Sequence, residues 1–238
     1  MPKNWQYLTI SIGTVETLFT GKTLEKGRYA IWPKGPEIPL TFIFAMASSS
    51  TKSAVRMGEN AWAKTPKVNA EFFALTYGAM VNQLVRDYED VAEVNRQLEV
   101  MGYNIGIRLI DEFLAKSGMA APCQNHQQTA DTIAKVAFKM FLGVAADVTS
   151  WNAERTSFSL VIYENPLAEF VELPPSLSEL RYSNLLCGAV RGALEMINIK
   201  ADCRFLRDTL RGDEVNEIQV DITEVMEDSM GDEYRDNS

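Results

Sequence analysis

Apolar residues in the middle of the chain recur every three or four positions, which is the spacing of one face of a helix. The spacing predicts one helix over residues 73–88 and another over residues 94–113, which ends before Gly118. We expect a third helix over residues 129–143. Its inward face is formed by Ile133, Val136, Ala137, Met140 and Phe141. The three helices predict a helical layer.

Two glycines, Gly102 and Gly106, lie four positions apart inside the second predicted helix. Glycine in a helix interior costs about 1 kcal/mol relative to alanine. The pair therefore indicates a neighbour that approaches the helix backbone closely. The layer is as much a candidate interface with a partner as it is a core.

Beyond residue 150 the pattern changes to the alternation of half-buried strands. Asn165-Pro166 predicts a turn, Ser183 is the expected cap of a helix that runs to residue 199, and Gly212 connects the last two strands. The extended segments are expected at residues 157–162, 169–173, 201–208 and 216–223. Helices followed by strand pairs with short connections favour the α+β class, with a helical layer packed on a small antiparallel sheet.

The chain divides into four parts by composition. Residues 1–56 carry turn residues and a low-complexity "ASSSTKS" run, which predicts a disordered extension or an artefact of an upstream start. A polar leader covers residues 57–67, and the folded domain is expected over residues 68–223. Residues 224–238 are predicted to form an acidic, solvated tail.

The net charge of −9 argues against a general nucleic-acid surface, because phosphate binding needs a basic face. The three cysteines are an odd count without a regular framework, which favours a reducing compartment such as the cytosol. No apolar run has the roughly 20 residues that span a bilayer. Any contact with a membrane is therefore expected to be peripheral.

The loop "SGMAAPCQNHQQTAD" holds Cys123 three positions before His126, the only histidine in the chain. A nucleophilic pair needs a base that is oriented by a third group, and structural zinc needs about four ligands. The segment offers neither, so we assign no catalytic residue and no metal ligand. The simplest interpretations are a solvated loop histidine and a loop thiol without a role.

Cys123 differs from the other two cysteines in its position, because it precedes a helix whose inward face is apolar. A thiol there could open onto a hydrophobic cavity, and the helix N-terminus would lower its pKa. This combination suits acylation by a fatty thioester better than hydrolysis. Cys187 and Cys203 lie in apolar patterns and are expected to be small buried side chains.

Four runs occur in order: "MGYNIGIRLIDEFLAKSG", "TADTIAKVAFKMFLGV", "NPLAEFVELP" and "YSNLLCGAVRGALEM". In these the chain resembles the Bet-three subunits of the TRAPP complex, the transport protein particle, over about residues 68–222. The resemblance implies a non-enzymatic subunit that dimerises through its helical layer, with itself or with related TRAPP subunits. It also implies a tethering complex that acts in endoplasmic-reticulum-to-Golgi vesicle transport and promotes nucleotide exchange on a Rab GTPase.

The resemblance further implies an internal hydrophobic channel that takes a fatty acyl chain, held as a thioester on a cysteine eight positions before the aspartate of a T-A-D motif. Cys123 and Asp131 keep that spacing, so Cys123 is the predicted site of a covalent palmitate. Ile133, Ala137 and Met140 are the predicted channel lining. The chain departs from the family in Pro122, where a basic residue is common, in a slightly longer loop, and in its acidic C-terminus.

Three functions follow as hypotheses. The first is a core scaffold subunit of the tethering complex, cytoplasmic and peripheral at the cis-Golgi and endoplasmic reticulum. The second is a lipid-binding module that carries or senses an acyl chain. The third is a Cys/His hydrolase. An acyl adduct on Cys123, free exchange of a non-covalent lipid, and turnover of a thioester would distinguish them.

Overall fold

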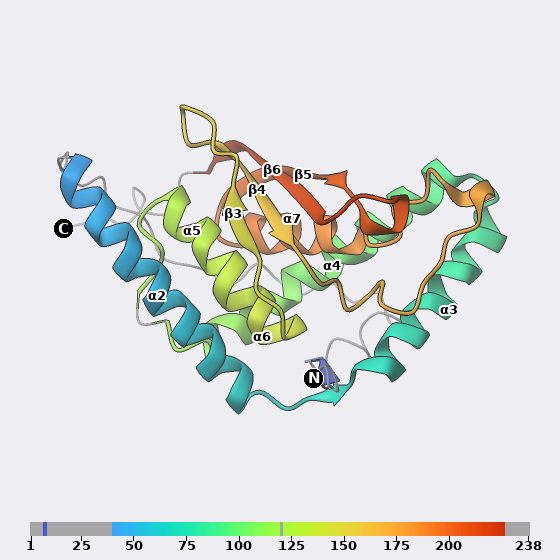
Figure 1. Cartoon of the computed structure of the whole chain (residues 1–238), viewed down its shortest axis with the longest axis horizontal. Helices are drawn as coiled ribbons and strands as arrows, with labels where there is room; N and C mark the ends of the chain where they lie inside the picture. The colour runs from blue at the N-terminus through green and yellow to red at the C-terminus, as the bar shows by residue number, and fades with distance from the viewer. Residues whose placement is uncertain (1–6, 9–39, 120, 227–238) are drawn as a thin grey trace, which may run out of the picture.

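The structure is a computed structural model that describes residues 7–8, 40–119 and 121–226 of the 238-residue chain. Helices α2 and α3 lie on opposite sides of the molecule, and α4 and α7 lie beneath one face of a sheet (Figure 1). The helical elements are α2 (Leu40–Lys64), α3 (Ala70–Tyr88), α4 (Val91–Lys116), α5 (His126–Thr132), the π-helix η1 (Ile133–Ala137), α6 (Phe138–Leu142) and α7 (Leu185–Glu195), with short 3-10 turns η2 (Pro175–Leu177) and η3 (Thr209–Arg211).

The main sheet is antiparallel throughout and has the strand order β3-β4-β6-β5. Leu160 pairs with Ile218 and Cys203 with Val220, so the apolar positions of neighbouring strands meet on one face. The predicted α+β class is confirmed. The strands are β3 (Asp147–Thr149), β4 (Ser157–Ile162), β5 (Ile199–Arg207) and β6 (Asn216–Val225), and β1 (Tyr7–Leu8) pairs separately with β2 (Val68–Asn69).

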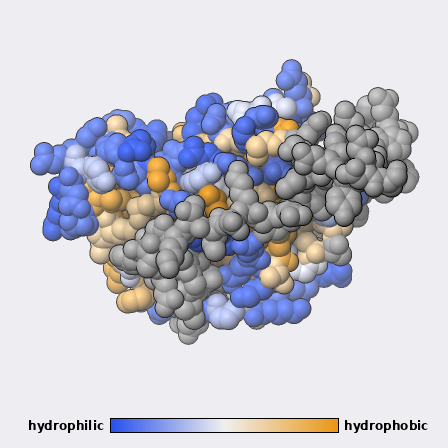
Figure 2. Space-filling view, turned by 180° about the vertical axis from the view of Figure 1, so that it is seen from behind, coloured by the Kyte–Doolittle hydropathy of each residue, from blue (hydrophilic) through white to orange (hydrophobic). Residues whose placement is uncertain are grey.

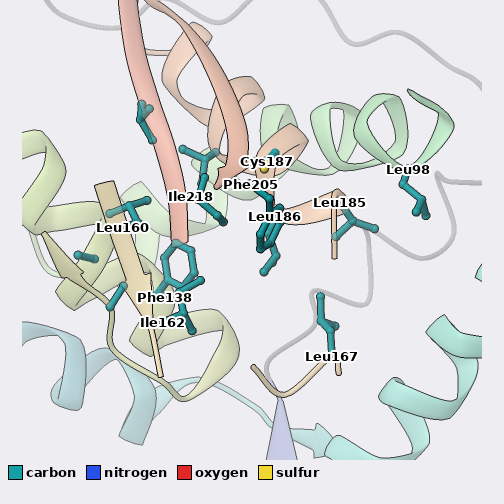
Figure 3. Packing of buried hydrophobic residues seen from close by; sticks show 14 of the residues in the cluster. Leu98, Phe138, Leu160, Ile162, Leu167, Leu185, Leu186, Cys187, Phe205 and Ile218 are labelled. Atoms are coloured by element: carbon teal, nitrogen blue, oxygen red, sulfur yellow. The ribbon is translucent and has the colours of Figure 1, made fainter. Parts of the chain in front are cut away.

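The main core lies between this sheet and the helices α4, α6 and α7. Leu160, Ile162 and Ile218 point from the sheet toward Phe138 and Leu186 on the helices (Figure 3). All five side chains are buried. Each side chain of this kind contributes about 1.5–3 kcal/mol when it is removed from water, so this contact holds the two layers together.

Helices α4 and α7 pack so closely that their backbones are in direct contact. A Cβ atom on Gly102 would lie 2.0 Å from the carbonyl oxygen of Leu185, and one on Gly188 would lie 2.0 Å from that of Glu99. Gly106 and Gly192 repeat the arrangement one turn along each helix. The closely approaching neighbour predicted from the glycine pair is therefore α7 of the same chain.

The third predicted helix begins earlier than expected and is not regular. Asn125 caps α5, and its side-chain oxygen accepts a hydrogen bond of 2.9 Å from the backbone nitrogen of Gln128. The first helical residue is His126 rather than Thr129. The helix then widens into the π-helix η1 before α6 ends at Gly143, whose φ of 73° suits a helix end.

Two details of the predicted third zone are wrong. Residues 169–170 lie in a turn and residues 171–173 in no regular element, so the expected strand is absent, because the backbone nitrogens of Ala168 and Val171 bond to carbonyls three residues earlier. Ser183 does not cap α7, because its hydroxyl accepts a 2.8 Å hydrogen bond from the side chain of Asn165. The helix starts at Leu185 without a side-chain cap.

The N-terminal boundaries also differ from the prediction. Helix α2 runs from residue 40 to residue 64, across the expected boundary at residue 56 and through most of the expected leader. The segment is helical where disorder was expected because Ala54, Met57 and Ala61 pack against an apolar cluster at α4 and α6. Residues 1–6 and 9–39 of the expected extension lie outside the described residues. So do residues 227–238 of the expected tail, while β6 includes residues 224–225.

Helix α3 keeps part of its apolar surface in contact with solvent. Phe72 is 71% exposed and Leu75 is 65% exposed, and both lie one turn apart near the start of the helix. Apolar residues gather on the side of the molecule that carries α3 (Figure 2). Exposed apolar patches of this kind are typical of protein interfaces.

Candidate acyl-binding site

Cys123 lies in the loop between α4 and α5, three residues before the first residue of α5. Its side chain is 7% exposed, and its Sγ atom shares a 3.4 Å hydrogen bond with the hydroxyl of Thr132 at the end of α5. The thiol therefore faces inward along the helix rather than out into solvent. Thr132 had no signal in the sequence, because its role depends on how the loop folds back.

Burial raises the pKa of the Cys123 thiol, although hydrogen bonds from Thr132 and Thr129 act in the opposite direction. The lowered pKa that the helix N-terminus predicted is thus wrong, since loss of solvent outweighs the helix end. The site holds a neutral thiol at neutral pH. It is shielded from water, which favours the persistence of a thioester once one has formed.

The described contact of His126 is with another loop and not with Cys123. Its Nδ1 atom lies 3.0 Å from the backbone oxygen of Arg155, in the loop between β3 and β4. The Arg155 guanidinium in turn donates a 2.6 Å hydrogen bond to Gln127 and lies over the ring of Trp151. The histidine therefore anchors a loop at the start of α5, a contact that the sequence did not reveal.

The T-A-D residues that follow form the buried side of α5. Thr129, Ala130 and Asp131 are all buried, and Asp131 lies eight positions after Cys123. Ala137 and Met140 pack in one apolar cluster at α4 and α6, whereas Ile133 packs against the main core. The three predicted lining residues thus lie on two sides of the same helix.

The other two cysteines are structural. Cys187 on α7 is fully buried, and burial raises the pKa of Cys203 on β5 to about 12. Within the described residues, no cluster of three histidine, cysteine or acidic side chains could hold a metal ion. In that same part of the chain every helix is too short or too polar to cross a bilayer.

A pocket of about 250 Å³ opens elsewhere on the surface, beside the turn that follows β4. Its lining mixes polar residues such as Glu164, Asn165 and Glu169 with apolar ones, and none of it comes from the Cys123 loop. We do not place the acyl site there. An acyl chain needs an apolar environment that continues from the thiol itself.

Comparison with known proteins bears directly on this fold. Residues 73–221 match the family described as transport protein particle (TRAPP) component. The trafficking protein particle complex subunit 3 of Dictyostelium discoideum is 53% identical over 179 residues, which cover 75% of this chain and 96% of that protein. The subunit BET3 of Saccharomyces cerevisiae is 44% identical over 188 residues, covering 78% of this chain and 97% of that protein.

A solved structure gives the corresponding comparison in three dimensions. It is a trafficking protein particle complex subunit 3 from Naegleria fowleri covalently bound to palmitic acid. The two chains are 49% identical with a TM-score of 0.65, and the match covers 67% of this chain and 98% of the other. The fold is therefore that of a helical layer on a small antiparallel sheet, as such subunits have. The chain belongs to the TRAPP component family.

Proposed function

We propose that the protein is a core scaffold subunit of a TRAPP tethering complex and carries a fatty acyl chain on Cys123. The observation that carries the proposal is the buried thiol at the start of α5, in a fold shared with a relative that holds covalent palmitate. In this function the subunit has no catalytic residue of its own. It supports Rab nucleotide exchange through assembly, in the cytoplasm and at membranes of the endoplasmic reticulum and cis-Golgi.

The proposed modification is a transfer between thioesters. The Cys123 thiolate attacks the carbonyl carbon of a fatty acyl thioester such as palmitoyl-coenzyme A. A bond forms between that carbon and Sγ, and the bond from the same carbon to the donor sulfur breaks. The departing thiolate takes up the proton that Cys123 released, so the exchange needs no oxidant, reductant or metal.

The raised pKa of Cys123 predicts that acylation accelerates with pH. At a pH below the pKa, the fraction of Cys123 present as thiolate rises about tenfold for each pH unit. Because the thiolate is the reacting form, the acylation rate should rise steadily between about pH 7 and pH 9. Thr132→Val removes a hydrogen bond that favours the thiolate, so this variant should be slower at neutral pH. Stopped reactions with palmitoyl-coenzyme A and intact-mass detection give the rates, and a plateau below the ordinary cysteine pKa would contradict the expectation.

The exposed start of α3 supports the proposal that related subunits, or a second copy, pack on this helix. Replacing both Phe72 and Leu75 by glutamate should weaken that association by about 2 kcal/mol or more for each residue. Light scattering with and without co-expressed TRAPP subunits measures the loss. Leu206→Glu, an exposed apolar position on β5, is the matched control. Equal association of both variants would remove α3 from the proposed interface.

Affinity purification tests membership of the complex. The full-length chain, tagged at one end and expressed at its natural level, should co-purify other TRAPP subunits. The variant with both α3 substitutions should recover fewer of them. Recovery of the folded wild-type chain with no other TRAPP subunit would overturn the scaffold function and favour an independent lipid-binding module.

A further inference from the structure

A second apolar cluster, separate from the main core, lies between α2, α4 and α6. Its buried members are Ala61, Ile110, Phe113, Val136, Met140 and Phe141. Among the residues whose side chains the structure describes, four methionines belong to it or pack against it, Met57, Met119, Met140 and Met196, whereas the main core is joined by Met80 alone. We call it the methionine cluster.

Helix α2 covers this cluster closely. Ala61 is 1% exposed, and a Cβ atom on Gly58 would lie 2.1 Å from the carbonyl oxygen of Lys135 in the π-helix η1. Figure 1 shows α2 lying along α5 and α6 on the side away from the sheet. This part of α2 precedes the residues that match the family, 73–221, yet it is packed as tightly as a core element.

The methionine cluster begins close to the candidate thiol along the chain. Cys123 contacts Thr132, and Val136 and Met140, which follow Thr132 by four and eight residues, are buried members of the cluster. Met119, four residues before Cys123, packs against the cluster from the loop. Apolar members of the cluster or its neighbours therefore lie within four residues of both Cys123 and Thr132, and the cluster extends to Ala61 on α2.

Methionine side chains suit a site that must open to accommodate an acyl chain. They are unbranched, rotate about three bonds and adapt to irregular spaces, so they can move apart around an acyl chain without breaking hydrogen bonds. The main core offers the opposite properties, since Phe138, Leu160 and Ile218 hold it between helix and sheet. A chain attached to Cys123 is accommodated at lower cost in the methionine cluster.

We infer that helix α2 forms the outer wall of the acyl site. The acyl chain on Cys123 runs along Val136 and Met140 and ends against Met57 and Ala61, so α2 sets the length of chain that fits. This inference rests on the proposed acylation of Cys123. It adds that a segment ahead of the residues that match the family determines which fatty acid is held.

Photo-crosslinking of the full-length wild-type protein tests the position of the chain end. The probe is palmitoyl-coenzyme A with a diazirine at the last carbon of the acyl chain. After acylation and irradiation, the crosslink should map to residues 52–64 or to α6. An adduct on Cys123 whose crosslinks fall only on α7 or the sheet would overturn this inference alone. Absence of any adduct would overturn it together with the proposed function.

A pair of variants on α2 tests the length limit. Ala61→Phe adds a large side chain on the buried face of α2. It should therefore lower palmitoyl occupancy by about tenfold, while the shorter lauroyl chain is still accepted. Ala63→Phe, an exposed position on the same helix, should behave as wild type. The readout is intact mass after reaction with each acyl-coenzyme A. Equal palmitoyl occupancy in both folded variants would contradict the assignment, and the crosslinking result stands even if Ala61→Phe fails to fold.

Discussion

Replacing Gly102 by alanine should destabilise the protein by about 3 kcal/mol or more, which is the upper range for added groups in a packed interior. The new Cβ atom would lie 2.0 Å from the carbonyl oxygen of Leu185, so α4 and α7 must separate. This cost exceeds the gain of about 1 kcal/mol that alanine brings to a helix. Urea denaturation followed by circular dichroism measures the free energy of unfolding.

Gly78→Ala is the matched control. Its Cβ atom would meet only the hydroxyl of Tyr182, at 3.2 Å, in the interior of helix α3. We expect its free energy of unfolding to change by less than about 1 kcal/mol, because a side-chain end can move by a few tenths of an ångström where a backbone cannot. Equal stabilities of the two variants would show that the backbone contact between α4 and α7 does not limit this fold.

Cys123→Ser should abolish the acyl adduct that forms on the wild-type protein with palmitoyl-coenzyme A. Serine keeps the size of the side chain and its hydrogen bond to Thr132 but is a far weaker nucleophile at neutral pH. Intact mass before and after hydroxylamine, which cleaves thioesters, identifies the adduct. The loss should be complete rather than partial, because Cys187 is buried and Cys203, although only half-buried, has its pKa raised to about 12.

Cys203→Ser provides the control for that experiment. Cys203 is a free thiol whose pKa burial raises to about 12, so its replacement should leave the adduct in place. An adduct that survives in Cys123→Ser and disappears in Cys203→Ser would move the acyl site to the interface of α7 and β5.

The elements that the sequence predicted well are those with a strong period. The helices at residues 73–88 and 94–113 and the strands at residues 157–162 and 216–223 all exist within a few residues of their expected ends. The glycine pair also indicated a close neighbour correctly. These features depend on the spacing of apolar residues along the chain, which is visible in the sequence itself.

The remaining features depend on contacts between distant residues. Residues 40–56 have no strong local signal, and the part of α2 whose side chains are described is held by α4 and α6. His126 contacts Arg155, and the Ser183 hydroxyl accepts a hydrogen bond from Asn165 instead of capping α7. The direction of the Cys123 pKa shift was misjudged for the same reason, because the burial that raises it follows from folding of the loop.

Peptide mapping of the protein isolated from its own cells tests the central claim most directly. The peptide that contains Cys123 should carry the mass of one palmitoyl group, and treatment with hydroxylamine should remove that mass. An unmodified Cys123 in protein that is bound to other TRAPP subunits, or a palmitoyl group on another cysteine, would contradict the assignment of Cys123 as the acyl attachment site.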